Sequence, residues 1–140
     1  MKSRLAPLAL PRLARLALLY TRDDDLKRVV RRALLGTGTI LHIARTVEDA
    51  LQIVCRRGRE LDVAIMAFNE DCRGMTLLGA IHGCCKQLPT LAVVDKDSEQ
   101  GRALAYANGA RFCLSKPVSS VELANAIADL QPAARQLALA

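Results

Sequence analysis

Acidic residues and one lysine follow the apolar runs of this 140-residue sequence, at places where side chains could bind a cation or a phosphate. Three aspartates (23–25) follow the first run, Glu70 and Asp71 follow the third, and Lys116 follows the fifth. Carboxylates are preferred ligands of Mg²⁺, and an ammonium group attracts phosphate oxygens. However, no glycine-rich phosphate loop occurs at 21–26 and no nucleophile–base pair is visible, so we expect no enzyme activity.

The cysteines and histidines form no metal-binding pattern. The five cysteines are Cys55, Cys72, Cys84, Cys85 and Cys113. No CxxC pair occurs, and neither His42 nor His82 completes a zinc motif, so we expect no metal and no cofactor. We interpret the cysteines as small hydrophobic residues that are buried in the core, in a protein of the reducing cytosol. Cys84 and Cys85 are adjacent on a predicted helix and point in different directions, which argues against a redox role.

Short apolar runs alternate with amphipathic patterns along the chain. Five runs have the length of strands: residues 15–21, 39–44, 61–68, 89–95 and 110–115. Each is followed by apolar residues at helical spacing, and Thr46 and Ser119 are predicted N-caps, the latter in a capping box with Glu122. Five strand–helix units predict an α/β fold with a parallel sheet that is covered on both faces. In such folds, sites lie beyond the carboxyl ends of the strands.

At these strand ends the chain resembles the receiver domain of two-component response regulators. The most specific segment is "GARFCLSKP" (109–117), and "LALLYTRDDDLKRVV", "LDVAIMAF", "GMTLL" and "LPTLAVV" are also similar in order and spacing. The resemblance covers residues 14–131 and implies a flavodoxin-like (βα)5 doubly wound sheet of order 2-1-3-4-5, with two helices on one face and three on the other. Residues 1–13 are then an irregular extension, and residues 132–140 a short tail.

The resemblance also implies a phosphoryl switch, most of whose residues are replaced here. In the family, an aspartate at the end of the third strand accepts the phosphoryl group, and this chain has Ala67 there. Thr21 and Arg22 stand at the acidic pair that holds Mg²⁺. Val94 replaces a residue with a hydroxyl group, and Asp95 replaces a small residue.

Lys116 alone keeps its place in the family pattern, where this lysine contacts the phosphoryl group. Without an acceptor, we expect Lys116 to pair with a carboxylate, and Asp95 and Asp23 are the candidates. We interpret the aspartates at 23–25 as residues favoured at a helix N-terminus, although one of them would reach the site if the register differed by one.

A contact surface is also implied, because receivers pair through the face formed by the fourth helix, fifth strand and fifth helix. The strand aromatic that rotates inward on activation in the family falls at Cys113 here, while Phe112 points to the opposite face of the sheet. We expect a homodimer contact on this face, with Tyr106 as its aromatic anchor. The predicted contact residues are Arg102, Tyr106, Arg111, Cys113, Glu122 and Asn125.

The substitutions predict a receiver-like signalling domain of a two-component phosphorelay that acts in the cytoplasm by phosphorylation-independent protein–protein interaction. Its partner would be a kinase, a regulator or a second copy. One alternative is a displaced phosphoacceptor, Glu70 or Asp71. Another is nucleic-acid binding by the basic runs 27–32 and 56–59 of this chain of net charge +6, although no stacking aromatic lies near either run. The sequence contains no uninterrupted apolar stretch of about 18 residues, so we expect no membrane span.

Overall fold

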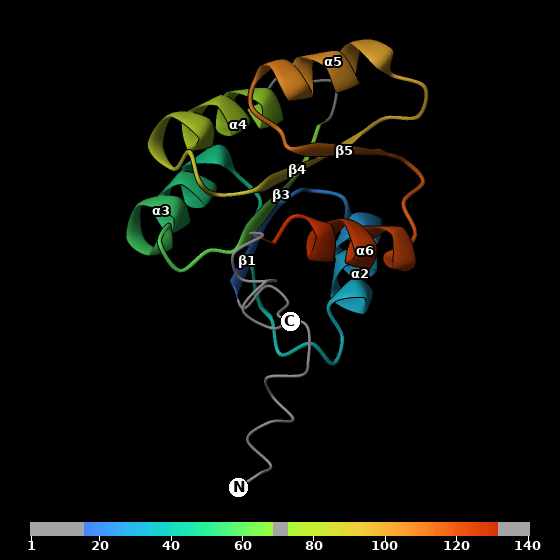
Figure 1. Ribbon diagram of the computed structural model, residues 1–140, viewed down its shortest axis with the longest axis horizontal. Coiled ribbons are helices and arrows are strands. Elements are labelled where there is room, and N and C mark those ends of the chain that lie inside the picture. Colours follow the sequence, from blue (N-terminus) through green and yellow to red (C-terminus); the bar gives the residue numbers. More distant parts are fainter. Residues whose placement is uncertain (1–15, 69–72, 132–140) are drawn as a thin grey trace, which may run out of the picture.

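Strands and helices alternate through the computed structural model, which describes residues 16–68 and 73–131 (Figure 1). The strands are β1 (Leu16–Tyr20), β2 (Ile40–Ala44), β3 (Val63–Ala67), β4 (Thr90–Val94) and β5 (Phe112–Ser115). The helices are α2 (Asp24–Ala33), α3 (Val47–Arg57), α4 (Arg73–Cys84), α5 (Glu99–Ala107) and α6 (Ser120–Asp129). The predicted extension (1–13) and tail (132–140) lie outside the described residues.

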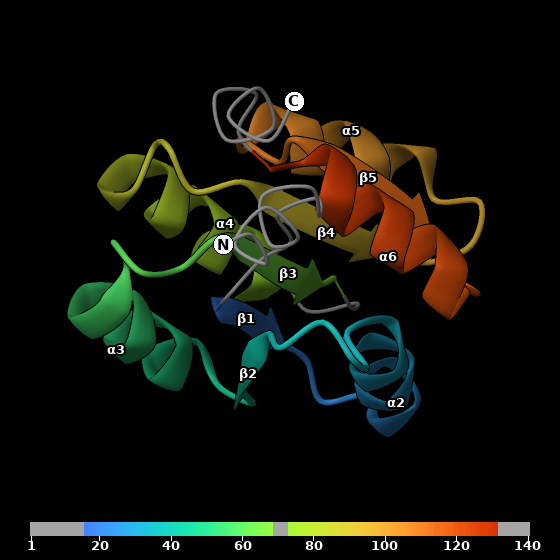
Figure 2. The same cartoon turned by 60° about the horizontal axis from the view of Figure 1, so that its bottom comes forward.

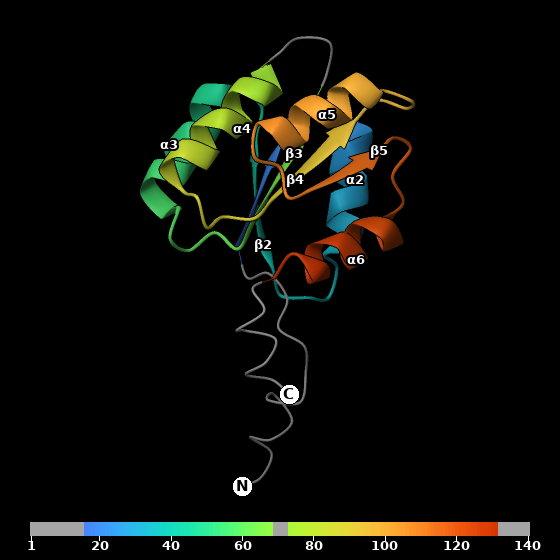
Figure 3. The ribbon, with the colours of Figure 1, turned by 45° about the horizontal axis from the view of Figure 1, so that its top comes forward.

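The strands form one parallel sheet of order β2-β1-β3-β4-β5, which confirms the predicted fold. Every residue of β1, β3 and β4 is buried. Helices cover both faces of these central strands, as Figure 3 shows, so their sequences are continuous apolar runs without alternation. Within the described ranges, no helix has the length and apolar character needed to cross a bilayer.

The two faces of the sheet carry separate hydrophobic clusters. Leu18 and Met66 pack on one face with residues of α3, α4 and α5, while Leu19 and Ile65 pack on the other with residues of α2 and α6. Successive strand residues point to opposite faces, so each strand supplies both clusters. The predicted division of two and three helices is therefore confirmed, and Figure 2 shows α2 and α6 together on their face.

Side chains cap the helices where the sequence predicts caps. The Thr46 side chain accepts a hydrogen bond from the Asp49 backbone N–H at 3.1 Å, and Ser119 and Glu122 form the reciprocal capping box. Helix α4 forms although Gly79 and Gly83 lower its intrinsic propensity. Its buried apolar stripe supplies the tertiary packing that outweighs this propensity.

The cysteines differ from one another in exposure. Cys113 is buried, as predicted, but Cys55 and Cys84 are exposed and Cys85 is half-buried. The interpretation of all the cysteines as buried hydrophobes is therefore wrong for Cys55 and Cys84. Both lie near the ends of helices, where the packed stripe reaches the surface. Cys72 lies outside the described residues.

Two glycines of α4 should respond oppositely to alanine. A Cβ at Gly74 would lie 2.7 Å from the carbonyl oxygen of Ala67 and 2.5 Å from the Phe68 ring, whereas a Cβ at Gly83 meets nothing within 4 Å. We expect Gly74→Ala to lower the free energy of unfolding by about 1–3 kcal/mol through overpacking. Gly83→Ala should raise it by about 0.5–1 kcal/mol, because alanine favours helix. Urea denaturation measures both values, and equal effects would contradict this packing of α4 on β3.

Candidate functional site

The ends of β1, β3 and β4 bring together three residues that the sequence assigns to a degenerate site. Tyr20 pairs with Met66 across β1 and β3, so Thr21 and Ala67 are the next residues along these two strands. Val94 ends β4, the neighbouring strand. Thr21, Ala67 and Val94 are each 1% exposed. The carboxyl-terminal end of the central strands is therefore closed and largely apolar, and these three residues supply no carboxylate.

Thr21 and Arg22 make local contacts in place of metal ligation. The Thr21 hydroxyl accepts the backbone N–H of Asp23 at 3.0 Å, and the Thr21 N–H donates to the Ala44 carbonyl at 3.1 Å. Arg22 is exposed, and its Nε donates to the Arg45 carbonyl at 3.3 Å, which directs the guanidinium toward the segment between β2 and α3. This pair of side chains does not fit the Mg²⁺ that the fold family implies, since neither is an anion.

At the same end of the sheet, Lys116, which follows β5, forms an ion pair with Asp23, which follows β1. Lys116 Nζ lies 3.3 Å from Asp23 Oδ2, with the two side chains 28% and 33% exposed. The Lys116 backbone N–H donates to the Val94 carbonyl at 2.9 Å, which holds the lysine beside β4. Of the two predicted partners, Asp23 is therefore the one in contact, while Asp95 is exposed. The lysine ammonium meets a negative charge without a phosphoryl group.

Asp23 also serves as the N-cap of α2. Its Oδ1 accepts the backbone N–H of Asp25 at 2.9 Å, while its other oxygen faces Lys116. Partial burial raises the pKa of Asp23, but the Asp25 N–H, the Lys116 ammonium and the Leu26 N–H together hold this pKa below its ordinary value of 3.8. One carboxylate thus both begins α2 and neutralises Lys116.

The remaining acidic candidates do not add a metal site in the described part of the chain. Asp24 pairs with Lys27 at 3.2 Å, and Asp25 pairs with Arg28, both on the surface of the first turns of α2. These contacts agree with their interpretation as residues of a helix N-terminus. Across residues 16–68 and 73–131, no group of three His, Cys, Asp or Glu side chains could hold a metal ion. The displaced candidates Glu70 and Asp71 lie outside the described residues.

The ion pair borders an open depression of about 410 Å³ between α2 and the segment that follows β5. Leu26, Val29 and Val118 form apolar walls, and Lys96 lines the depression together with Lys116. Sequence reasoning missed Lys96, because no motif of the resemblance includes it.

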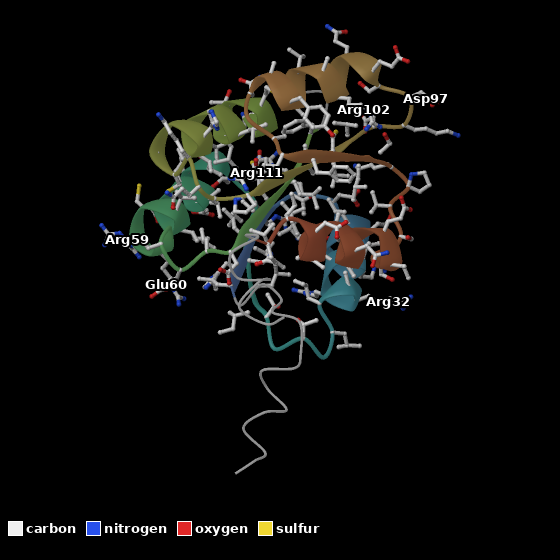
Figure 4. All side chains as sticks on the ribbon, in the orientation of Figure 1. Arg32, Arg59, Glu60, Asp97, Arg102 and Arg111 are labelled. Atoms are coloured by element: carbon white, nitrogen blue, oxygen red, sulfur yellow. The ribbon has the colours of Figure 1, made fainter. Side chains whose placement is uncertain are left out.

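The fifth strand carries no aromatic side chain beneath α5. Cys113 is 2% exposed on the α5 side of the sheet, where burial raises the pKa of its thiol although Arg102 acts in the opposite sense. Arg102, labelled in Figure 4, donates to the Cys113 carbonyl at 3.3 Å and to the Ser115 hydroxyl. The guanidinium thus ties α5 to β5 at the place where the resemblance implies a movable aromatic ring.

Large apolar side chains are exposed on the surface formed by α5, β5 and α6, which we call the α5–β5–α6 face. Their exposed fractions are 43% for Tyr106, 42% for Phe112 and 68% for Val121. Sequence reasoning named only Tyr106 among them. The exposure of Phe112 could have been predicted from strand alternation, because Phe112 alternates with the buried Cys113 along β5.

The predicted contact residues divide into two groups. Arg102, Arg111 and Asn125 are exposed like Tyr106. Cys113 is buried, so we remove it from the predicted surface and place Phe112 there. Glu122 is exposed, but its carboxylate accepts hydrogen bonds from the Ser119 hydroxyl and N–H as part of the α6 cap.

Comparison with known proteins places this fold among receiver domains. No protein-family model matches the sequence, and no curated protein is similar to it. A response regulator receiver domain from Clostridium thermocellum superposes with a TM-score of 0.74 at 20% identity, over 83% of this chain and 93% of that chain. The signal receiver domain of an HD domain-containing protein from Pseudomonas fluorescens gives a TM-score of 0.72 at 26% identity, with coverages of 83% and 93%. An orphan response regulator of H. pylori gives 0.69 at 18%, with coverages of 90% and 99%.

The ion pair predicts how stability depends on pH. The folded pKa of Asp23 lies below 3.8, so its contribution to stability is present above that value and is lost as pH falls through the folded pKa. Asp23→Asn keeps a capping side chain but removes the charge. Between about pH 5 and pH 2, the unfolding free energy of this variant should fall less steeply than that of the native chain.

Lys116→Met should also show a shallower fall, because it removes one cause of the lowered pKa of Asp23. Urea denaturation at a series of pH values measures the three slopes. Identical slopes would contradict the role assigned to the pair.

Proposed function

We propose that this chain is a receiver-like signalling module, a pseudo-receiver, that acts in a two-component pathway through protein–protein contacts without phosphorylation. It works in the cytoplasm, and its partner is a kinase, a regulator or a second copy of itself. The observation that carries this proposal is the pairing of Lys116 with Asp23, in a chain that has Ala67 at the end of β3. The cation that would meet a phosphoryl group already has a carboxylate partner, and the acceptor position has no reactive atom.

Four residues at the ends of neighbouring strands support the same proposal. Ala67 cannot accept a phosphoryl group, Thr21 and Arg22 offer no anionic ligand for Mg²⁺, and Val94 has no hydroxyl group to bond a phosphoryl oxygen. Phosphoryl transfer depends on positioned charges, so restoring one part alone leaves the other requirements unmet. Without phosphorylation, no phosphoryl group supplies the free energy that would shift the conformation of the module. Its signal must then depend on its concentration or on its partner.

The α5–β5–α6 face is the surface we assign to that partner. Its exposed Tyr106 and Phe112 offer aromatic anchors of the kind that contribute most at protein interfaces, and Arg111 adds a charge beside them. Arg102 is already bonded to β5, so the surface is ordered before binding and loses little conformational freedom. Self-association through this face is the simplest form of the proposal.

Nucleic-acid binding is less well supported by the arrangement of the basic runs. One run lies on α2 and the other at the end of α3, and these helices cover opposite faces of the sheet. Figure 4 shows Arg32 and Arg59 on opposite flanks of the molecule. Several of these cations also have partners, such as Arg28 with Asp25 and Arg57 with Glu60.

Restoring the acceptor alone should not restore phosphorylation. We expect Ala67→Asp to be labelled by acetyl phosphate no more than the native chain, because Arg22 and Val94 remain. A combined Thr21→Asp, Arg22→Asp, Ala67→Asp and Val94→Thr variant should gain Mg²⁺-dependent labelling, resolved on phosphate-affinity gels. Efficient labelling of the single variant would show that the metal site is intact. Labelling of the native chain would indicate a displaced carboxylate, Glu70 or Asp71, and would overturn the proposal.

Self-association can be tested on the exposed aromatic residues. Multi-angle light scattering should give a molar mass above that of the monomer for the native chain at high concentration. The Tyr106→Ala, Phe112→Ser double variant should be monomeric. The matched control is Leu35→Ser, which removes an apolar side chain that is 81% exposed outside the face. A native chain that stays strictly monomeric would refute self-association and leave a different protein as the partner.

A further inference from the structure

Three thiols lie at the C-terminal ends of α3 and α4, at the opposite end of the strands from the candidate site. Cys55 lies in the last turn of α3, Cys84 is the last residue of α4, and Cys85 follows it. All three line one depression of about 510 Å³. A neighbouring depression of about 600 Å³ shares Cys84 and Cys85 and reaches the starts of β3 and β4. The fold therefore joins cysteines that are far apart in the sequence.

The two helices approach closely at this point. A Cβ placed on Gly58 would lie 3.1 Å from the Cys85 sulfur, so this sulfur lies directly against the last turn of α3. Cys55 precedes Gly58 by three residues, and residues at this spacing are neighbours on a helix surface. Cys84 follows the fully buried Leu77 by seven residues and so lies on the same stripe of α4. The thiols of the two helices thus face a common groove.

Positive charge surrounds these thiols. Arg56, Arg57 and Arg59 line the first depression, and Lys86 lines the second with Arg59. Glu60 is paired with Arg57 at 2.6 Å and Asp62 lines the second depression, so four cationic side chains stand against two carboxylates and the local balance of charge is positive. Reactive cysteines occupy partly exposed and electropositive surroundings of this kind, whereas structural cysteines are buried and inert.

We propose that Cys55 and the adjacent Cys84–Cys85 pair form a redox-modification site, in which a peroxide oxidises Cys55 and one thiol of the pair to a disulfide that joins α3 to α4. This site is separate from the α5–β5–α6 face, which we assign to a protein partner.

The reaction balances with hydrogen peroxide as the oxidant. One cysteine sulfur attacks a peroxide oxygen, the O–O bond breaks, and a sulfenic acid and one water form. The second sulfur then attacks the sulfenic sulfur, forms the S–S bond and releases the second water. Two electrons pass from the two sulfurs to the peroxide, and both thiol protons end in water. Since Cys55 and Cys84 are exposed, a cellular thiol can reach and reduce the bond again.

Peptide mapping tests this site, because trypsin separates the cysteines of the two helices. Cys55 falls in peptide 46–56 and the adjacent pair in peptide 74–86, while Cys72 falls in peptide 60–73. The full native chain is treated with hydrogen peroxide at low protein concentration, its free thiols are alkylated, and the monomer fraction is digested without reduction. We expect peptides 46–56 and 74–86 linked, with the loss of two hydrogens, and the link should disappear on reduction.

Two matched variants complete the experiment. Cys55→Ser should abolish the link while leaving the fold intact, since the residue is exposed, and Cys113→Ser should leave the link unchanged, since Cys113 is buried elsewhere. Complete alkylation of Cys55 after peroxide treatment would overturn the proposal. A bond confined to peptide 74–86, a bond from Cys55 to Cys72, or a link found only between molecules would overturn it equally.

Discussion

The burial of β1, β3 and β4 on both faces is the constraint on which the rest of the structure depends. Every residue of these strands is buried, so their sequences must be apolar and their register is fixed by packing against two helical layers. The residues that follow the strands are consequently placed side by side. This is why Thr21, Ala67 and Val94 all lie at the carboxyl-terminal ends of neighbouring strands, although Ala67 packs on the face covered by α2 and α6 and Val94 on the opposite face.

At that end of the sheet, Lys116 pairs with a carboxylate. Asp23 caps α2 and faces Lys116 at 3.3 Å, so two elements distant in the sequence are held together by one carboxylate. A partly exposed ion pair contributes modestly to stability, so its main consequence is electrostatic: the lysine charge is largely neutralised. Lys96 and the apolar walls beside it leave an open depression next to this ion pair.

The fold could be predicted from the sequence, whereas the surface features could not. Periodicity and caps located every element, because strand burial and helix amphipathicity leave direct patterns. Strand alternation also predicted that Cys113 and Phe112 face opposite ways. The sequence assigned Cys113 both to the core and to the contact surface, and the structure places Cys113 in the core and Phe112 at the surface. The approach of Cys55 to Cys84 and Cys85 depends on how α3 packs against α4, and no local pattern encodes that contact. The choice of Asp23 over Asp95 as the partner of Lys116 likewise required side-chain geometry.

The central claim is that this receiver fold no longer responds to a phosphoryl group. Amide NMR spectra of the native chain, recorded during titration with Mg²⁺ and then with the phosphoryl mimic beryllium fluoride, test it most directly. The account predicts no saturable change at residues 21–23, 67, 94 or 116, and none at Cys113 or along α5. Saturable shifts at the edge that contains Ala67, propagating to β5 and α5, would contradict it and show a working switch.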